Sequence, residues 1–158
     1  MDIKITNQLN NNSPVHIRNI ISQTGVFSES EVQVARELAE EHLSNTDSSY
    51  LFQLAYHNEE LLGYTCYGEI PMTDKRYDLY WIAVSPKAQG SGLAQQLIET
   101  THKHIRSLNG THVYAETSST SNYNSARKFY IKQKYIEVAR IPSFYKEGDD
   151  KVIYAYYL

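Results

Sequence analysis

The sequence predicts a single domain of the α/β or α+β class. Its 158 residues suffice for one domain with a full core, and 41% hydrophobic with 21% charged residues is ordinary for a soluble globular protein. Apolar runs of strand length alternate with segments of helical periodicity along the chain. No internal repeat or low-complexity tract divides these segments, so we expect residues 1–158 to form one domain.

The first half of the chain predicts a strand, two helices and a strand hairpin. Ile17, Ile20 and Ile21 recur at the spacing of one helix face. Ser28 and Glu31 have the spacing of a capping box, which predicts the start of the second helix. The elements expected here are a strand at 2–6, a helix at 14–25, a helix beginning at Ser28, and strands at 50–56 and 61–68 joined at 57–60.

The second half predicts two strand–helix units and a final hairpin. Leu93, Leu97 and Ile98 lie at the spacing of a core-facing helix stripe, shortly after Pro86 closes a strand. The elements expected here are a strand at 77–84, a helix at 93–108, a strand at 111–118, a helix at 124–134, and strands at 135–140 and 152–158 across an acidic turn at 146–150.

Composition and charge argue against several functional classes. The net charge is −3, with 15 basic and 18 acidic residues, whereas nucleic-acid binding favours a clustered basic excess. No apolar run approaches the length that spans a bilayer and no signal-peptide pattern begins the chain, so we expect a cytoplasmic protein with no membrane and no nucleic-acid partner. The single cysteine, Cys66, and the lack of His-Glu-x-x-His spacing argue against a disulfide framework and a metal site.

A glycine-containing turn between residues 87 and 94 predicts an anion-binding site. Its sequence, Lys-Ala-Gln-Gly-Ser-Gly-Leu-Ala, follows the apolar run 79–84 and leads into the helix at 93–108. A strand that ends in such a turn directs unpaired backbone N–H groups, and the positive end of the helix dipole, toward one small volume. The P-loop pattern is missing, and the dinucleotide pattern Gly-x-Gly-x-x-Gly fails because Gln95 occupies its third glycine position.

Two blocks of the sequence resemble the GNAT superfamily of N-acetyltransferases. The turn is similar to that family's acyl-CoA signature, Gln/Arg-x-x-Gly-x-Gly/Ala, with Lys87 where glutamine or arginine is usual. Residues 124–130 match its second block, Asn-x-Ala-x-x-Phe-Tyr on a helix, in the correct order and at the correct separation. Lys134 departs from the family, which usually has glycine there, so we expect a different backbone geometry in the turn after this helix.

The resemblance implies a mixed sheet of about seven strands with helices on both faces, in which the fourth and fifth strands run parallel and splay apart. It also implies acetyl-CoA as the cofactor, with its pantetheine arm beside the fourth strand and its diphosphate at the glycine turn. A backbone bulge near Ile82 and Val84 would turn an N–H toward the thioester oxygen. The residues expected to bind the cofactor are Ile82, Ala83, Val84, Lys87, Ala88, Gln89, Gly90, Ser91, Gly92, Leu93, Ala94, Asn122, Asn124, Ala126 and Tyr130.

Three residues are candidates for acid–base catalysis. Tyr130 matches the family's tyrosine near the cofactor sulfur, and a phenol with a pKa of about 10 can donate a proton to the departing thiolate. Asp78 occupies roughly the position of the carboxylate base in histone-acetylating relatives, and strand alternation places it on one face with Tyr80 and Ile82. Glu116 on the fifth strand is the alternative base, and water alone could also carry the proton away.

The expected function is acetyl-CoA-dependent transfer of an acetyl group to the primary amine of a small molecule or peptide by direct attack. Two alternatives stay open: a catalytically inactive module that binds CoA or acyl-CoA, and a toxin-like acetyltransferase that acts on aminoacyl-tRNA. The acidic pair Asp149 and Asp150 has two interpretations, attraction of a cationic amine or a solvated turn. These patterns do not determine whether the protein is a homodimer, which acyl chain it prefers, or which amine it acetylates.

Overall fold

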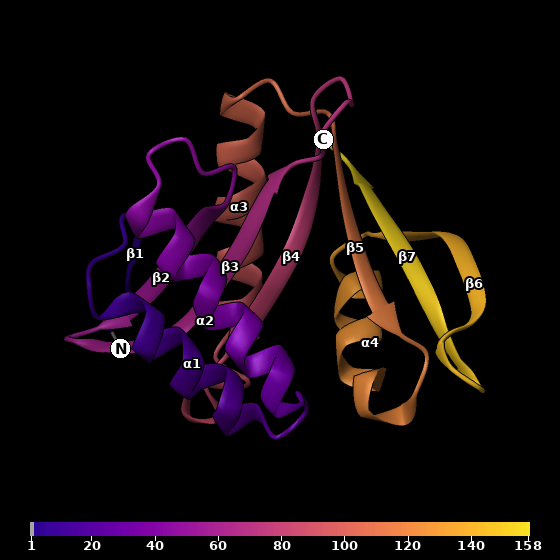
Figure 1. Cartoon of the computed structure of the whole chain (residues 1–158), viewed down its shortest axis with the longest axis horizontal. Coiled ribbons are helices and arrows are strands. Elements are labelled where there is room, and N and C mark those ends of the chain that lie inside the picture. Colours follow the sequence, from indigo (N-terminus) through magenta and orange to yellow (C-terminus); the bar gives the residue numbers. More distant parts are fainter. Residues whose placement is uncertain (1) are drawn as a thin grey trace.

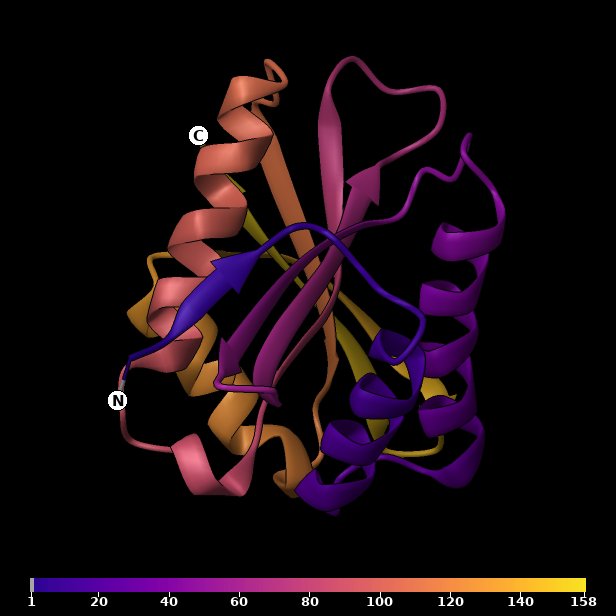
Figure 2. The same cartoon turned by 90° about the vertical axis from the view of Figure 1, so that its left-hand side faces the viewer.

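Seven strands form one mixed sheet with helices on both faces in the computed structural model, which describes residues 2–158 (Figures 1 and 2). The strand order is β1-β2-β3-β4-β5-β7-β6, with β4 and β5 parallel and the other neighbours antiparallel. The elements are β1 (Lys4–Thr6), α1 (Ser13–Thr24), α2 (Glu29–Ser44), β2 (Leu51–His57), β3 (Glu60–Glu69), β4 (Arg76–Val84), η1 (Pro86–Ala88), α3 (Leu93–Ser107), β5 (His112–Ser118), η2 (Ser121–Tyr123), α4 (Asn124–Lys132), β6 (Ile136–Lys146) and β7 (Asp149–Tyr157). The predicted fold class is confirmed.

The four α-helices divide between the two faces of the sheet (Figure 2). Ile17 of α1 belongs to one buried cluster with Phe52 of β2. Ile98 of α3 and Tyr130 of α4 belong to another, with Val113 of β5. In Figure 1, α1 and α2 lie in front of the first four strands, and no helix of residues 2–158 lies in front of β5 and β7. None of the described helices is long and apolar enough to cross a bilayer.

The second helix begins at Ser28, as the sequence predicts. Ser28 Oγ accepts a hydrogen bond from the backbone N–H of Glu31 (3.2 Å), and the Glu31 carboxylate accepts one from the backbone N–H of Ser28 (2.6 Å). Both bonds of this capping box form within four residues. The start of α2 therefore depends on local sequence and needs no distant contact.

Lys134 ends the α4 segment in the backbone conformation that glycine usually adopts, so the expectation of a different turn geometry is wrong. Its φ is +67°, its N–H donates to the carbonyl of Ile131 (3.0 Å), and the N–H of Tyr135 donates to the carbonyl of Tyr130 (3.0 Å). This pair of bonds is a Schellman motif. The rings of Tyr130 and Tyr135 lie 5.3 Å apart, so the motif also holds Tyr130 in place. A left-handed conformation costs a non-glycine residue about 1–2 kcal/mol, which packing of the motif has to offset.

The last hairpin is longer than predicted. Lys146 at the end of β6 pairs with Asp149 at the start of β7, so Glu147 and Gly148 alone form the turn. Gly148 has a φ of +78°, which a two-residue hairpin turn requires. The polar composition of this segment predicted a loop, but Asp149 and Asp150 belong to a strand and are not a solvated turn.

β4 and β5 pair over only four residues and then separate. Residues 76–79 of β4 pair with residues 112–115 of β5, whereas residues 80–84 have no partner on β5. Figure 1 shows the two strands diverging from the end of the sheet near the C-terminus. The predicted splay is confirmed, and it leaves backbone N–H and C=O groups of both strands facing a gap.

A bulge at Tyr80 decides which side chains of β4 share a face. Consecutive residues of β3 pair with Leu79 and Trp81, so Tyr80 is an extra residue in β4. Leu79 and Ile82 both contact the α3 side of the core, and Trp81 contacts the α1–α2 side. Since Asp78 alternates with Leu79, it lies on the face opposite Ile82. The predicted shared face of Asp78 and Ile82 is therefore wrong, and the bulge precedes its expected position.

Candidate active site

A cleft of about 930 Å³ occupies the gap between β4 and β5. Its walls include the α1–α2 connection, the first turn of α3, part of η2 and α4, and the end of the β6–β7 hairpin. The predicted site residues that line it are Asp78, Ile82, Ala83, Val84, Ala88, Gln89, Gly90, Gly92, Leu93, Ala94, Glu116, Asn122, Ala126 and Tyr130. The structure thus brings the candidate acid, both candidate bases and the glycine turn to one cavity.

Three predicted cofactor residues do not line this cleft, and their side chains are engaged elsewhere. Lys87 is 69% exposed, and its Nζ forms an ion pair with Glu60 (2.6 Å). Ser91 Oγ donates to the carbonyl of Ala88, and the Asn124 side-chain oxygen accepts from the Arg127 guanidinium. Where glutamine or arginine is usual in the acyl-CoA signature, this chain therefore uses its lysine to brace the turn against the β2–β3 hairpin.

The glycine turn presents backbone N–H groups that have no acceptor. Gly90 and Gly92 have φ values of +76° and +83°, and neither N–H finds a backbone partner within the described chain. Gly92 is the N-cap of α3 and offers no side-chain cap, so the N–H groups of the first helical turn are also free. Free N–H groups at the positive end of a helix bind anions such as a diphosphate.

The open edge of β4 fits an extended ligand that carries amide groups. On the side facing β5, the backbone groups of residues 80–84 have no strand partner. An extended chain with amides can pair with such an edge as an added strand does. The edge leads through η1 directly into the glycine turn. This order of donors and acceptors fits coenzyme A, in which an amide-containing pantetheine arm continues into a diphosphate.

Tyr130 lies near the end of α4 and lines the cleft. Its ring stacks on Tyr154, with 5.6 Å between the ring centroids. Burial raises the pKa of Tyr130 and the neighbouring Tyr154 raises it further, so the hydroxyl is protonated at neutral pH. The hydroxyl of Tyr135 bonds to His102 Nε2 (2.7 Å), whereas that of Tyr130 has no hydrogen-bond partner within residues 2–158. Tyr130 is thus held by its ring, and its proton is free for a ligand.

The two candidate bases differ in their charge environments. Burial, reinforced by the negative charge of Glu116 and opposed by Lys151, raises the pKa of Asp78 to about 6. Glu116 is 47% exposed and forms an ion pair with Lys151 Nζ (2.8 Å). A base whose pKa lies just below neutral pH is ionised and still binds protons effectively. Asp78 therefore has the properties of a general base, whereas Glu116 already has a cation partner.

The cleft is also lined by residues that the sequence did not single out. Phe27 contacts Trp81 and Tyr123 edge-on, with ring centroids 5.1 Å and 6.3 Å apart. Glu31 and Tyr145 line the same cleft. These side chains come from the α1–α2 region, β4, η2 and β6, so no local motif connects them. The high tyrosine content, 14 residues, was the one available signal, and it is equally explained by half-buried sheet positions.

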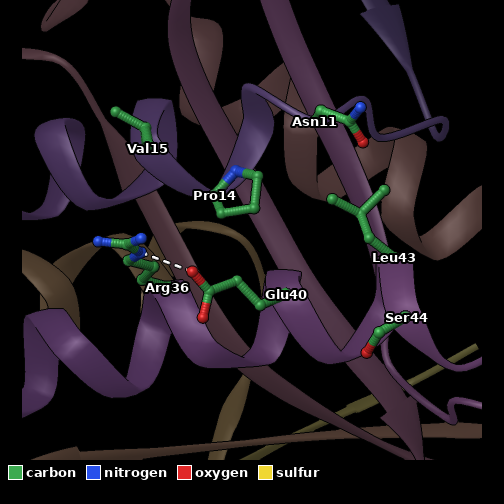
Figure 3. A pocket seen from close by; sticks show the side chains of 7 residues that line it. All are labelled: Asn11, Pro14, Val15, Arg36, Glu40, Leu43 and Ser44. Carbon is green, nitrogen blue, oxygen red and sulfur yellow. Dashed lines mark hydrogen bonds and ion pairs between the residues drawn. The ribbon is translucent and has the colours of Figure 1, made fainter.

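A second, smaller hollow of about 260 Å³ lies between α1 and α2 (Figure 3). Figure 3 shows its only charged lining residues among those described, Arg36 and Glu40, which are paired with each other at 2.7 Å across one helical turn. A satisfied surface ion pair offers neither a free nucleophile nor a free base. The larger cleft is therefore the candidate active site.

An open strand edge, a glycine turn with free N–H groups, and the Tyr130 and Asp78 side chains line one cleft, an arrangement that fits an acyltransferase. The model of the Acetyltransferase (GNAT) family matches residues 16–135. The crystal structure of a protein from Desulfovibrio desulfuricans, assigned to the GNAT family, matches with a TM-score of 0.95 and 36% identity over 99% of both chains. This chain therefore belongs to the GNAT family of acetyltransferases, as the resemblance implied.

More distant structures share the fold. The ribosomal-protein-S18-alanine N-acetyltransferase of Escherichia coli matches with a TM-score of 0.77 at 18% identity, over 99% of this chain and 94% of the other. An aminoglycoside 6'-N-acetyltransferase in complex with coenzyme A matches with a TM-score of 0.75 at 15% identity, over 99% of this chain and 97% of the other. A search of curated protein sequences found no match.

Proposed function

We propose that this acetyltransferase uses acetyl-CoA to acetylate a primary amine of a small molecule or peptide by direct attack of the amine. One observation carries the proposal: the open β4 edge, the free N–H groups of the glycine turn, Tyr130 and Asp78 all face one cleft. When bound, the cofactor supplies an acyl group already activated as a thioester. The chain then has to hold that ligand, orient the amine and move two protons.

The backbone supplies most of the cofactor contacts in this proposal. Residues 80–84 pair with the pantetheine amides, and the N–H groups of Gly90, Gly92 and the first turn of α3 hold the diphosphate. Asn122 and Ala126 form the α4 side of the cleft. Because backbone groups do most of this work, side-chain changes such as lysine at position 87 are tolerated.

The two proton transfers fall to Asp78 and Tyr130. An alkylammonium with a pKa of about 10.4 must lose a proton before it can attack, and Asp78 accepts that proton directly or through water. The departing thiolate, with a thiol pKa of about 8.5, is stabilised when the Tyr130 hydroxyl donates its proton to the sulfur. Asp78 comes from β4 and Tyr130 from α4, so the two groups approach the reacting centre from different elements of the cleft.

Replacement of Asp78 with asparagine is expected to lower kcat/KM about 100-fold above pH 7 and to have a smaller effect below pH 6. The base must be ionised to accept a proton, and its pKa of about 6 means that wild-type activity rises as pH increases through that value. Ionisation of the amine affects both proteins equally. The measurement is therefore the ratio of wild-type to variant kcat/KM between pH 5 and 8, which should rise through pH 6 and level off.

Glu116→Gln is the control for this profile. The negative charge of Glu116 raises the pKa of Asp78. Its removal should therefore shift the midpoint of the rise in activity below pH 6, while activity still rises with pH. A pH-independent ratio for Asp78→Asn would exclude Asp78 as the base. If the rise in activity with pH is lost in Glu116→Gln instead, Glu116 is the general base.

The function itself is tested with purified protein, acetyl-CoA and a panel of primary amines and amine-bearing peptides. We expect release of free thiol that depends on the amine, matched by the mass of one added acetyl group on the acceptor. Acetyl-CoA binding without thiol release for every acceptor would indicate an inactive CoA-binding module. Failure to bind acetyl-CoA would overturn the proposal altogether.

A further inference from the structure

We propose that the acceptor carries a second cationic group besides the reacting amine, and that Asp149 binds it. The inference rests on the proposed function and adds the class of substrate: a diamine, or an amine with a guanidinium or second ammonium group joined by an apolar linker. It starts from a buried carboxylate whose charge the chain leaves unpaired.

Asp149 is the first residue of β7, is only 8% exposed and lines the cleft. One carboxylate oxygen accepts a hydrogen bond from Ser118 Oγ (2.5 Å). The other has no hydrogen-bond partner within residues 2–158, and no lysine, arginine or histidine of that range lies within 4.0 Å of the group. Burial of an unpaired carboxylate is unfavourable, so a cation in the cleft is its natural partner.

The neighbouring Asp150 has a different environment. It forms an ion pair with Arg140 (3.4 Å) and accepts a hydrogen bond from the backbone N–H of Ser143 (2.9 Å). Both interactions lie within the hairpin and need no ligand. The acidic pair therefore divides into one carboxylate that supports the fold and one, Asp149, that is available to a substrate.

Acidic side chains outnumber basic ones among the residues that line the cleft. Four carboxylates line the whole cleft, those of Glu31, Asp78, Glu116 and Asp149, against one cation, Lys132 near the end of α4. Burial raises the pKa of Tyr145, and the negative charges of Glu116, Asp149 and Glu31 raise it further. Glu116 is paired with Lys151, and the Glu31 carboxylate accepts the backbone N–H of Ser28 in the capping box, so Asp149 has the carboxylate best placed to bind a cation. The excess negative charge of the lining also repels a polyanion such as tRNA.

Aromatic rings complete a site for a cation with an apolar linker. Phe27, Trp81, Tyr123 and Tyr145 line the cleft beside these carboxylates. Ring faces attract ammonium and guanidinium groups, and the chain already has one such contact, Lys151 Nζ at 4.3 Å from the centroid of Phe144. The same rings cover hydrocarbon, so the linker between two cationic groups has a surface to lie on.

Strand geometry sets the distance between the two cationic groups. Asp78 pairs with Tyr114 on β5, and Asp149 bonds to Ser118, four residues farther along that strand. At about 3.3 Å per residue this separation is roughly 13 Å between backbone positions, and both aspartates line the cleft. We therefore expect nitrogen atoms on the order of 7–13 Å apart, as in α,ω-diamines of about five to nine carbons.

The experiment compares α,ω-diamines of four to ten carbons with monoamines of the same length, by thiol release from acetyl-CoA. For wild-type protein we expect diamines to have at least about tenfold higher kcat/KM, with an optimum at intermediate length. Asp149→Asn keeps an acceptor for the Ser118 hydroxyl and should reduce the diamine advantage to within about threefold. Glu147→Gln removes one negative charge two residues away, in the turn outside the cleft, and should retain the advantage.

The possible outcomes separate this proposal from the proposed function. Equal rates for monoamines and diamines at every length, with thiol release intact, would overturn the second cationic site and leave the acetyltransferase assignment in place. A diamine advantage that survives Asp149→Asn would overturn the role of Asp149. If Asp149→Asn fails to fold, as judged by circular dichroism, the comparison of diamines with monoamines on the wild-type protein tests the second cationic site by itself. Absence of thiol release with all amines would overturn both proposals.

Discussion

Tyr130→Phe is expected to lower kcat by about 100- to 1,000-fold while the Kd for acetyl-CoA changes less than about twofold. The hydroxyl has no hydrogen-bond partner within residues 2–158, so its removal leaves no donor or acceptor of the chain unsatisfied. The ring keeps its stacking on Tyr154 and its place in the Schellman motif. What the variant loses is a protonated donor that acts only when the sulfur departs, which lowers kcat and not ground-state binding.

Tyr154→Phe is the matched control for that experiment. Its ring stacks on Tyr130 at 5.6 Å, yet Tyr154 does not line the cleft. We expect its kcat to stay within about twofold of wild type, because general acid catalysis needs a donor within hydrogen-bond reach of the sulfur. The measurements are steady-state thiol release and calorimetric titration with acetyl-CoA. Unchanged turnover in Tyr130→Phe, or equal losses in both variants, would remove Tyr130 from the mechanism.

Gly92→Val is expected to weaken acetyl-CoA binding about 10- to 100-fold, which corresponds to roughly 1.4–2.8 kcal/mol. Gly92 lies at the wall of the cleft, and a Cβ built on it meets no atom within 4 Å. The valine side chain therefore projects into the open space where the diphosphate is proposed to bind. It also places a β-branched residue at a φ of +83°, which disturbs the free N–H groups that begin α3.

Gly148→Val separates the loss of binding from backbone strain. Gly148 has a φ of +78°, and a Cβ on it likewise meets nothing within 4 Å, but it lies in the β6–β7 turn outside the cleft. Both variants should lose about 1–2 kcal/mol of unfolding free energy in urea titrations, and only Gly92→Val should lose affinity for acetyl-CoA. Equal affinities in the two variants would contradict the placement of the diphosphate.

The parts of this protein that short-range chemistry determines were predictable before any coordinates. The capping box of Ser28 and Glu31 forms within four residues, and its helix begins where the pattern placed it. The glycine turn combines a strand end, two left-handed glycines and a helix start within a few residues. Local hydrogen bonds and φ preferences act over the same distances that a sequence motif covers, so such features can be read directly.

Other features depended on contacts between distant segments. The bulge at Tyr80 comes from the pairing of β4 with β3, and it moved Ile82 to the face opposite Asp78. The motif predicts that Lys87 binds the cofactor, yet in the fold its Nζ forms an ion pair with Glu60, 27 residues earlier. Lys134 shows the reverse: the glycine is missing, but the chain still adopts the left-handed turn, next to the packed rings of Tyr130 and Tyr135.

Local sequence patterns determine the fold class, the order of strands and helices, and the anion-binding turn, because hydrophobic periodicity and turn chemistry act between near neighbours. Local patterns do not determine the charge state of Asp78 or the burial of Asp149, because each depends on groups that chain folding brings together. Asp78 owes its raised pKa to burial and to Glu116, 38 residues away, and Asp149 is covered beside Ser118, 31 residues away. Electrostatic interactions and desolvation depend on distance in space, and only the packed sheet sets those distances.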